Sequence, residues 1–348
     1  MIATVVLAAT LSAAPVLEHY EKNEAQHLVP MLVEVIQFPT TQYDLDAHAR
    51  QKEWLKKAAA DLGFVFRDAG KIAEIELPGP GNAPVLGLVI HGDVQPADPD
   101  PWTYSPFSGK VADGYVWGRG SADDKGPLIQ ALLAMKALKE SGLPRTHTIR
   151  LLVGSEEESA ATEMTEYLKD HTPPDYSLVL DSEFPVVVGE KAWDGIALAT
   201  PMGPRPGVKK PWRAIKLDAG LSPSIVPDRA EVALQWIKGT SQWAKLEKEL
   251  RAFRMPEGTR LVVDVEADAM RVIAYGVSAH AGVNLTGGRN ALVALARAVE
   301  GKLPSGGAND LLAFARLAGK DLYGTGLGIT GDDPVWGRYA VNVATVKP

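Results

Sequence analysis

The chain has 348 residues, 46% of them hydrophobic, with a formal net charge of -7 at pH 7 and no cysteine. This length can bury a sizeable core and favours two domains over one. The negative charge, without a dense lysine and arginine patch, argues against a nucleic acid partner. Without cysteine, a metal site must be built from histidine, aspartate and glutamate.

The first 14 residues predict a secretory signal peptide. The apolar run in MIATVVLAATLSAAP is too short to span a membrane, and the small residues Ser12 and Ala14 suit cleavage after Ala14. The mature protein would then be periplasmic or secreted. Because no positive charge precedes the run, a buried N-terminal segment of a cytoplasmic protein, or a mis-set start codon, is the alternative.

Residues 15–194 predict one domain in which helices and strands alternate. Continuous apolar runs such as APVLGLVI predict buried parallel strands, and apolar residues at helical spacing predict the helices between them. The pattern indicates an α/β fold with a mostly parallel sheet and helices on both faces. The predicted helices cover residues 28–38, 46–64, 123–142 and 159–171, and the predicted strands cover residues 83–93, 146–154 and 176–185.

Residues 195–348 predict a second domain of a different kind. A passage rich in proline and glycine opens it, and the strands that follow alternate polar with apolar residues. This pattern is typical of an α+β domain in which helices cover one face of an antiparallel sheet. The predicted strands cover residues 213–220, 229–237 and 259–268, and the predicted helices cover residues 241–253 and 288–300.

Acidic side chains and one histidine follow the ends of the first domain's strands. His91 and Asp93 end one strand, three glutamates at 156–158 follow the next, and Asp181 and Glu183 end the third. Since the carboxyl ends of parallel strands share one edge of a sheet, these side chains should converge.

An adjacent pair, Asp123 and Asp124, precedes a predicted helix in the glycine-rich segment GRGSADDKG. So many carboxylates at one edge are costly unless a cation neutralises them, and a mixture of imidazole and carboxylate suits zinc better than magnesium or calcium. Read one by one, the alternatives are a solvated loop for the glutamates, a helix cap for the aspartate pair and a structural role for His91.

Four ordered segments resemble one known family. They are HGDVQPADPDPWTYSPFSGKVADGYVWGRGSADDKG, GSEEES, DSEFPVVVGEK and GVSAHAGVNLTGGRNA. They resemble the dinuclear zinc peptidases that include glutamate carboxypeptidase, aminoacylase and succinyl-diaminopimelate desuccinylase, in the carnosinase-like dipeptidase branch. The resemblance runs from about Val29 to the C-terminus. It implies an α/β catalytic domain and an inserted α+β lid domain that can form a homodimer.

The resemblance also implies two zinc ions per subunit, with cobalt or manganese as alternatives. His91 and Asp181 would bind one zinc, Glu158 would bind the other, and Asp123 would bridge the two. Asp93 would orient the ring of His91.

The remaining roles implied by the resemblance concern the reaction itself. Glu157 would be the general base, Glu156 would support it, and His280 on the lid would stabilise the oxyanion of the tetrahedral intermediate. A surface loop histidine is the alternative for His280. The predicted function is hydrolysis of the amide bond of dipeptides or short peptides by an exopeptidase. The alternatives are an N-acyl amino acid deacylase with the same site, and a noncatalytic metal-binding or peptide-binding homologue.

One family feature is missing from the sequence. Family members place a further zinc-ligating histidine near the end of the chain, but no histidine follows His280 here. We therefore expect that the C-terminal segment of the catalytic domain is absent from these 348 residues. A degenerate homologue that has lost one ligand is the alternative, and either reading puts the activity of this chain alone in question.

Overall fold

The computed structural model describes residues 13–100, 102–182, 187, 189, 192, 194–207, 210–237, 239 and 242–347. The chain divides into two compact units after residue 188. The predicted signal peptide lies outside the described residues up to residue 12, and so does Glu183. In the described part of the chain, no helix is long and apolar enough to cross a membrane.

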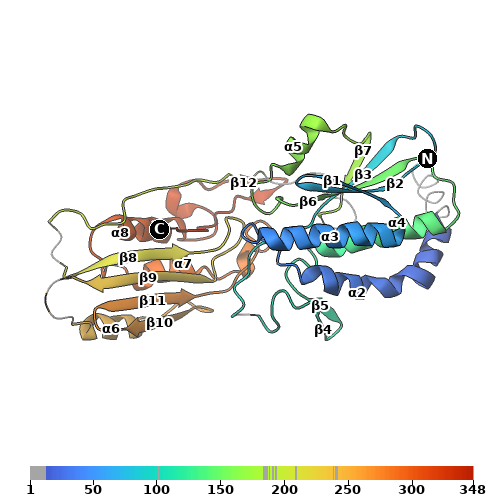
Figure 1. Cartoon of the computed structure of the whole chain (residues 1–348). Helices are drawn as coiled ribbons and strands as arrows, with labels where there is room; N and C mark the ends of the chain where they lie inside the picture. The colour runs from blue at the N-terminus through green and yellow to red at the C-terminus, as the bar shows by residue number, and fades with distance from the viewer. Residues whose placement is uncertain are drawn as a thin grey trace. The chain divides into compact units, whose positions relative to one another are not determined.

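The first unit is built on a five-stranded sheet with the order β1-β2-β6-β3-β7 (Figure 1). β3 pairs in parallel with β6 and β7, whereas β2 is antiparallel to β1 and β6, so four of the five strands run in one direction. This confirms the predicted mostly parallel sheet. The strands are β1 (Val65–Ala69), β2 (Ile72–Leu77), β3 (Val85–His91), β6 (Thr148–Gly154) and β7 (Tyr176–Val179).

Helices cover both faces of this sheet, as the sequence predicts. The π-helix η1 (Tyr20–Glu24), α2 (Ala25–Ile36), α3 (Leu45–Leu62) and α4 (Lys125–Glu140) share one apolar core with the sheet, and α5 (Glu163–Asp170) covers the other face through Tyr167. Figure 1 shows α3 and α4 on the opposite side of the sheet from α5. α3 begins where Asp44 accepts a hydrogen bond from the Ala47 amide (2.9 Å), and it ends at Gly63, whose φ of 73° favours glycine.

The hairpin of β1 and β2 was not among the predicted elements. In β2 the acidic residues Glu74 and Glu76 alternate with apolar residues, a pattern typical of a half-exposed strand, yet all six residues of β2 are buried. The two glutamates can be buried because Arg67 and Arg150 approach them from the neighbouring strands. A second, two-stranded sheet of β4 (Lys110–Ala112) and β5 (Tyr115–Trp117) lies in the long loop after β3.

The second unit has a four-stranded antiparallel sheet with the order β10-β11-β9-β8. Its helices and the sheet share one buried core, in agreement with the predicted α+β pattern. β11 and α8 were not predicted. The elements are β8 (Trp212–Ala219), β9 (Arg229–Trp236), α6 (Ala244–Arg251), β10 (Arg260–Val265), β11 (Ala269–Tyr275), η2 (Leu285–Gly287), α7 (Ala291–Ala298), α8 (Gly307–Ala318), η3 (Thr325–Leu327), β12 (Asp332–Asp333) and β13 (Gly337–Arg338).

Candidate metal centre

The predicted convergence of strand ends is present in the first unit. His91 is the last residue of β3, and Asp181 follows the neighbouring parallel strand β7. Asp123 and Asp124 directly precede α4, in the turn that brings the chain back to this edge. The carboxyl edge of the sheet therefore collects an imidazole and several carboxylates, as expected for a parallel sheet.

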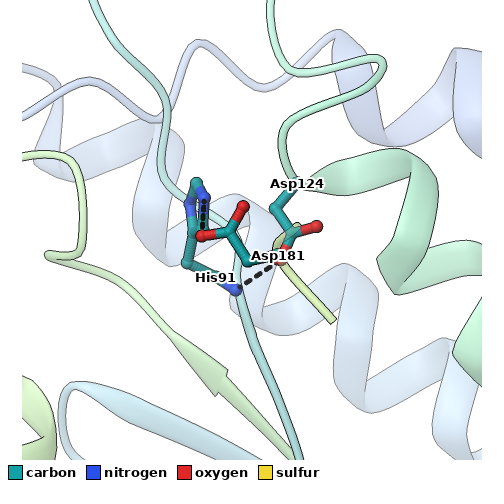
Figure 2. Close-up of side chains that lie close together, drawn as sticks. All are labelled: His91, Asp124 and Asp181. Atoms are coloured by element: carbon teal, nitrogen blue, oxygen red, sulfur yellow. Dashed lines mark hydrogen bonds and ion pairs between the residues drawn. The ribbon is translucent and has the colours of Figure 1, made fainter. Parts of the chain in front are cut away.

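His91 is the centre of the cluster. Its side chain is only 3% exposed, and its Nε2 lies 2.9 Å from Asp123 Oδ1 and 3.6 Å from Asp181 Oδ2. Its backbone N–H donates to Asp124 Oδ2 (3.2 Å). Donor atoms of His91, Asp124 and Asp181 all lie within 4.8 Å of one another, and Figure 2 shows the three side chains facing a common point.

Asp124 is a member of the cluster to which the sequence assigned no ligand role, although the Asp123 and Asp124 pair was expected at this edge. It occupies the N-cap position of α4, but its side chain makes no capping hydrogen bond, so the helix-cap reading does not apply to it. The residue is fully buried, and its Oδ1 finds no hydrogen-bond partner among the described residues. Desolvation, opposed by the nearby His91 and increased by Asp181, raises the pKa of Asp124 to about 8. The adjacent acidic pair was the only sequence signal for it.

The charge on His91 depends on its acidic neighbours. Burial alone would lower the pKa of the imidazolium, but the carboxylates of Asp123, Asp93 and Asp181 raise it to about 12. Ring atom Nδ1 lies 3.0 Å from the Asp93 backbone oxygen and 3.4 Å from its carboxylate. Asp93 thus contacts the ring nitrogen opposite to the one that faces the cluster, as expected for a residue that orients the ring.

The loop that carries Glu157 and Glu158 is attached to the same centre. The Asp93 carboxylate accepts hydrogen bonds from the backbone N–H groups of Glu157 (3.2 Å) and Glu158 (3.0 Å). Gln95 Nε2 donates to the Glu158 carboxylate (2.8 Å) and to its backbone oxygen (3.0 Å). Gln95 was not among the predicted residues, because the hydrogen-bond partner of a loop glutamine is set only by the folded chain.

Both glutamates sit in surroundings that disfavour their charge. Desolvation, with Asp123 and Glu157 adding to it, raises the pKa of Glu158 to about 7. Desolvation likewise raises the pKa of Glu157, and the negative charges of Asp181, Asp93 and Asp123 act in the same direction. A cation bound among these groups would remove the penalty.

Lys125, the residue after Asp124, does not supply that cation. Lys125 is fully buried, but its Nζ donates to the backbone oxygens of Val35 (3.0 Å) and Phe38 (2.6 Å) at the end of α2. Burial lowers the pKa of Lys125 to about 7. The Lys125 ammonium group is therefore engaged with the end of α2.

His280 lies in the second unit, in the segment that follows β11. It is exposed, its Nδ1 accepts a hydrogen bond from the Val283 backbone N–H (3.2 Å), and its strand-like bridge to Ile225 fixes its backbone. The predicted role of His280 stays a prediction.

The donor set fits a divalent transition metal. One imidazole and two carboxylates with donor atoms within 4.8 Å match the ligands that zinc, cobalt and manganese accept, and Asp124 Oδ1 is a buried oxygen in need of a partner. Asp123 and Glu158, the other predicted ligands, lie beside this set and outside the group of three.

Fold and cluster together define an α/β protein with a candidate metal site of histidine and aspartate. The chain belongs to peptidase family M20/M25/M40, whose family model matches residues 87–334. This match confirms the family resemblance seen in the sequence motifs.

Known relatives are longer than this chain. YtjP of Bacillus subtilis (strain 168) is 28% identical over 265 residues, which cover 76% of this chain and 56% of that protein. The Beta-Ala-Xaa dipeptidase of Lactobacillus delbrueckii subsp. lactis is 29% identical over 311 residues, which cover 87% of this chain and 62% of that protein. The chain therefore spans less than two thirds of the length of either relative.

Among solved structures, human carnosine dipeptidase 1 is 13% identical to this chain and aligns over 82% of it and 76% of the human chain, with a TM-score of 0.42. Similarity at this level adds nothing to the family assignment, which rests on the sequence match.

Proposed function

We propose that this chain carries the catalytic centre of a metal-dependent peptidase that hydrolyses the amide bond of dipeptides or short peptides. The observation that carries the proposal is the group of His91, Asp124 and Asp181, of which His91 and Asp124 are buried, with two glutamates of raised pKa attached beside it. The family membership and the name of the Beta-Ala-Xaa dipeptidase support the substrate class.

His91 and Asp181 would hold one metal ion, Glu158 a second, and Asp123 would bridge them, with Asp124 close enough to share this task. Zinc is the ion we propose, and cobalt or manganese suit the same donors. When bound, such ions act as Lewis acids that polarise an amide carbonyl and lower the pKa of water.

Glu157 is the proposed general base. Its carboxylate would take a proton from the water that attacks the amide carbon, and it would return this proton to the amine nitrogen as the C–N bond breaks. A carboxylate whose pKa lies above its usual value is better matched to both transfers near neutral pH. Asp93 supports the step because it holds the Glu157 amide and the ring of His91 at once.

His280 is proposed to stabilise the oxyanion of the tetrahedral intermediate. Its Nδ1 accepts the Val283 N–H, so the neutral ring carries its proton on Nε2, where it can donate to an oxygen. A homodimer through the second unit, and export of the protein, stay predictions as well.

The test combines metal content per chain with hydrolysis of a dipeptide panel and an N-acyl amino acid panel, for the wild type, Glu157→Ala and Glu53→Ala. Glu53 is exposed on α3 and serves as the control. Glu157→Ala should keep the metal and lower kcat by about 10²–10⁴, while Glu53→Ala should match the wild type.

The panels also separate the alternatives. Hydrolysis of N-acyl amino acids alone would identify a deacylase. Metal binding without hydrolysis in either panel would contradict the proposed activity and favour a binding homologue.

A further inference from the structure

The loop over residues 155–162, which joins β6 to α5 and carries Glu157 and Glu158, is held by contacts outside the metal cluster as well as by Asp93. These outer contacts centre on Glu156. Its Oε2 accepts hydrogen bonds from Lys71 Nζ (2.8 Å) and from Thr162 Oγ1 (2.7 Å). Glu156 thus links one end of the loop to the other, and both to a distant part of the chain.

Lys71 comes from the turn between β1 and β2, 85 positions away from Glu156 in the sequence. Its Nζ also donates to Thr162 Oγ1 (3.1 Å) and to the Glu166 carboxylate on α5 (3.2 Å). Its backbone oxygen accepts a hydrogen bond from Ser155 Oγ (2.8 Å). Lys71 therefore contacts the first, second and last residues of the loop.

The loop itself is tightly folded. The Glu156 backbone oxygen accepts hydrogen bonds from the N–H groups of Ser159 (3.1 Å) and Ala161 (2.7 Å). Ala161 has a φ of 50°, in the left-handed region that a residue with a side chain rarely adopts. A backbone of this kind persists where surrounding contacts hold it in place.

We propose that Lys71 is a positioning residue: paired with Glu156, it holds the loop over residues 155–162 so that Glu157 keeps its place beside the cluster. The catalytic part of this inference rests on the proposed function. A displacement of about 1 Å at a catalytic group lowers a rate by up to about 10²-fold. No other residue outside the metal cluster has this set of described contacts with both ends of the loop.

Lys71 and Glu156 have side chains of opposite charge and form an ion pair, with 2.8 Å between Nζ and Oε2. The two side chains are 38% and 26% exposed, and exposed pairs add little to global stability. A change at Lys71 should therefore affect the loop more than the unfolding temperature.

The experiment compares Lys71→Met, Glu156→Gln and the double variant with Lys71→Arg, which can rebuild the pair, and with Lys52→Met as control. Lys52 Nζ donates to Asp68 Oδ1 (2.9 Å) and to the Gly70 backbone oxygen (2.5 Å), so it belongs to the same hairpin but binds a different segment. The measurements are kcat and KM for a dipeptide, and amide hydrogen exchange over residues 155–162.

Lys71→Met and Glu156→Gln should each lower kcat about 10-fold or more, with KM changed less than about twofold. The double variant should be no slower than the single ones, since the same contact is lost. Lys71→Arg should recover most of the rate, and Lys52→Met should match the wild type. Amide hydrogen exchange over residues 155–162 should rise about 10-fold in Lys71→Met and stay unchanged in Lys52→Met.

Equal kcat and equal exchange in Lys71→Met and Lys52→Met would overturn the inference, and so would additive losses in the double variant. If the wild type hydrolyses no dipeptide with metal supplied, the proposed function fails. The exchange comparison then still decides whether Lys71 holds the loop.

Discussion

Two regions of the first unit bury carboxylates, and they treat them in opposite ways. On β2, Glu76 is bound by the guanidinium groups of Arg67 (3.1 and 3.2 Å) and Arg150 (3.1 Å), and these contacts outweigh desolvation and lower the pKa of Glu76. At the carboxyl edge, desolvation prevails, and it raises the pKa of Asp124 to about 8 and of Glu158 to about 7.

The comparison distinguishes a structural network from a site prepared for a ligand. A buried acid with its own arginine is complete within the chain. At the carboxyl edge, Lys125 is turned toward backbone oxygens, and a bound cation would offset the charge of the acids there. Acids whose pKa is raised, so that the protonated form is favoured, therefore lie at the candidate site. Acids paired with arginine lie in the structural part of the unit.

The largest expected effect is that of the metal itself. Zinc at about 1,000 times its dissociation constant should stabilise the chain by about 4 kcal/mol, measured as a shift in the thermal unfolding temperature and reversed by a chelator. Because ligands must lose their protons to bind a metal, binding at pH 7 should release more than one proton per chain from His91, Asp124 and Glu158.

Calorimetry in two buffers of different ionisation enthalpy counts these protons. The variant His91→Gln is the control, since it removes the donor on which the cluster is centred. Zinc binding without proton release would contradict the assigned protonation of the metal-free cluster.

The second prediction compares how one acid of each region, Glu76 and Glu158, contributes to the free energy of unfolding. In the metal-free protein at pH 8, Glu76→Gln should lower the free energy of unfolding by about 2–3 kcal/mol, because it leaves two guanidinium groups with the weaker contacts to Glu74 alone. Glu158→Gln should change it by less than about 1 kcal/mol or raise it, because an amide can keep a hydrogen bond with Gln95 without the cost of a desolvated charge. Urea denaturation measures both, and equal losses would remove the distinction between the regions.

The third prediction concerns pH. Asp124 and Glu158 keep protons in the folded state that the unfolded chain has lost above pH about 4, and His91 does so above pH about 6.5. The stability of the metal-free protein should therefore fall as pH rises from about 5 to 7, while above pH 7 the lowered pKa of Lys125 acts in the opposite sense. Glu76 acts in the opposite sense: its folded pKa is lowered, so its contribution is present above about pH 4.5 and lost as pH falls through that folded pKa.

Urea denaturation as a function of pH tests both trends. Glu76→Gln should reduce the loss of stability at acid pH. Saturating zinc should reduce the loss of stability of the metal-free protein as pH rises. A metal-free stability that rises from pH 5 to 7 would contradict the raised pKa values at the edge.

The smallest expected effect lies in the scaffold. Tyr167 Oη donates to Glu74 Oε1 (2.6 Å), and Tyr167→Phe removes this buried hydrogen bond. The free energy of unfolding should fall by about 1 kcal/mol, while zinc affinity stays unchanged. Tyr43→Phe, at a side chain that is 70% exposed, is the matched control. A loss of zinc affinity in Tyr167→Phe would show that the two regions are coupled.

The sequence alone determined the type of fold and the edge of the sheet where acidic side chains gather. Apolar runs and helical spacing predicted the parallel strands and both helical faces, because burial imposes these periods on the residues. His91 and Asp181 were expected at one shared edge, because each follows a predicted parallel strand and such strands all end there.

Only the tertiary structure decided which acids lie beside an arginine. Glu76 contacts Arg67 and Arg150 on adjacent strands, whereas Glu158 accepts a hydrogen bond from the neutral Gln95. Asp124 joined the cluster instead of capping α4, and Lys71 reached the loop at Glu156 from 85 positions away. These hydrogen bonds join residues that are close in space but distant in sequence. The local pattern of residues does not predict such distances.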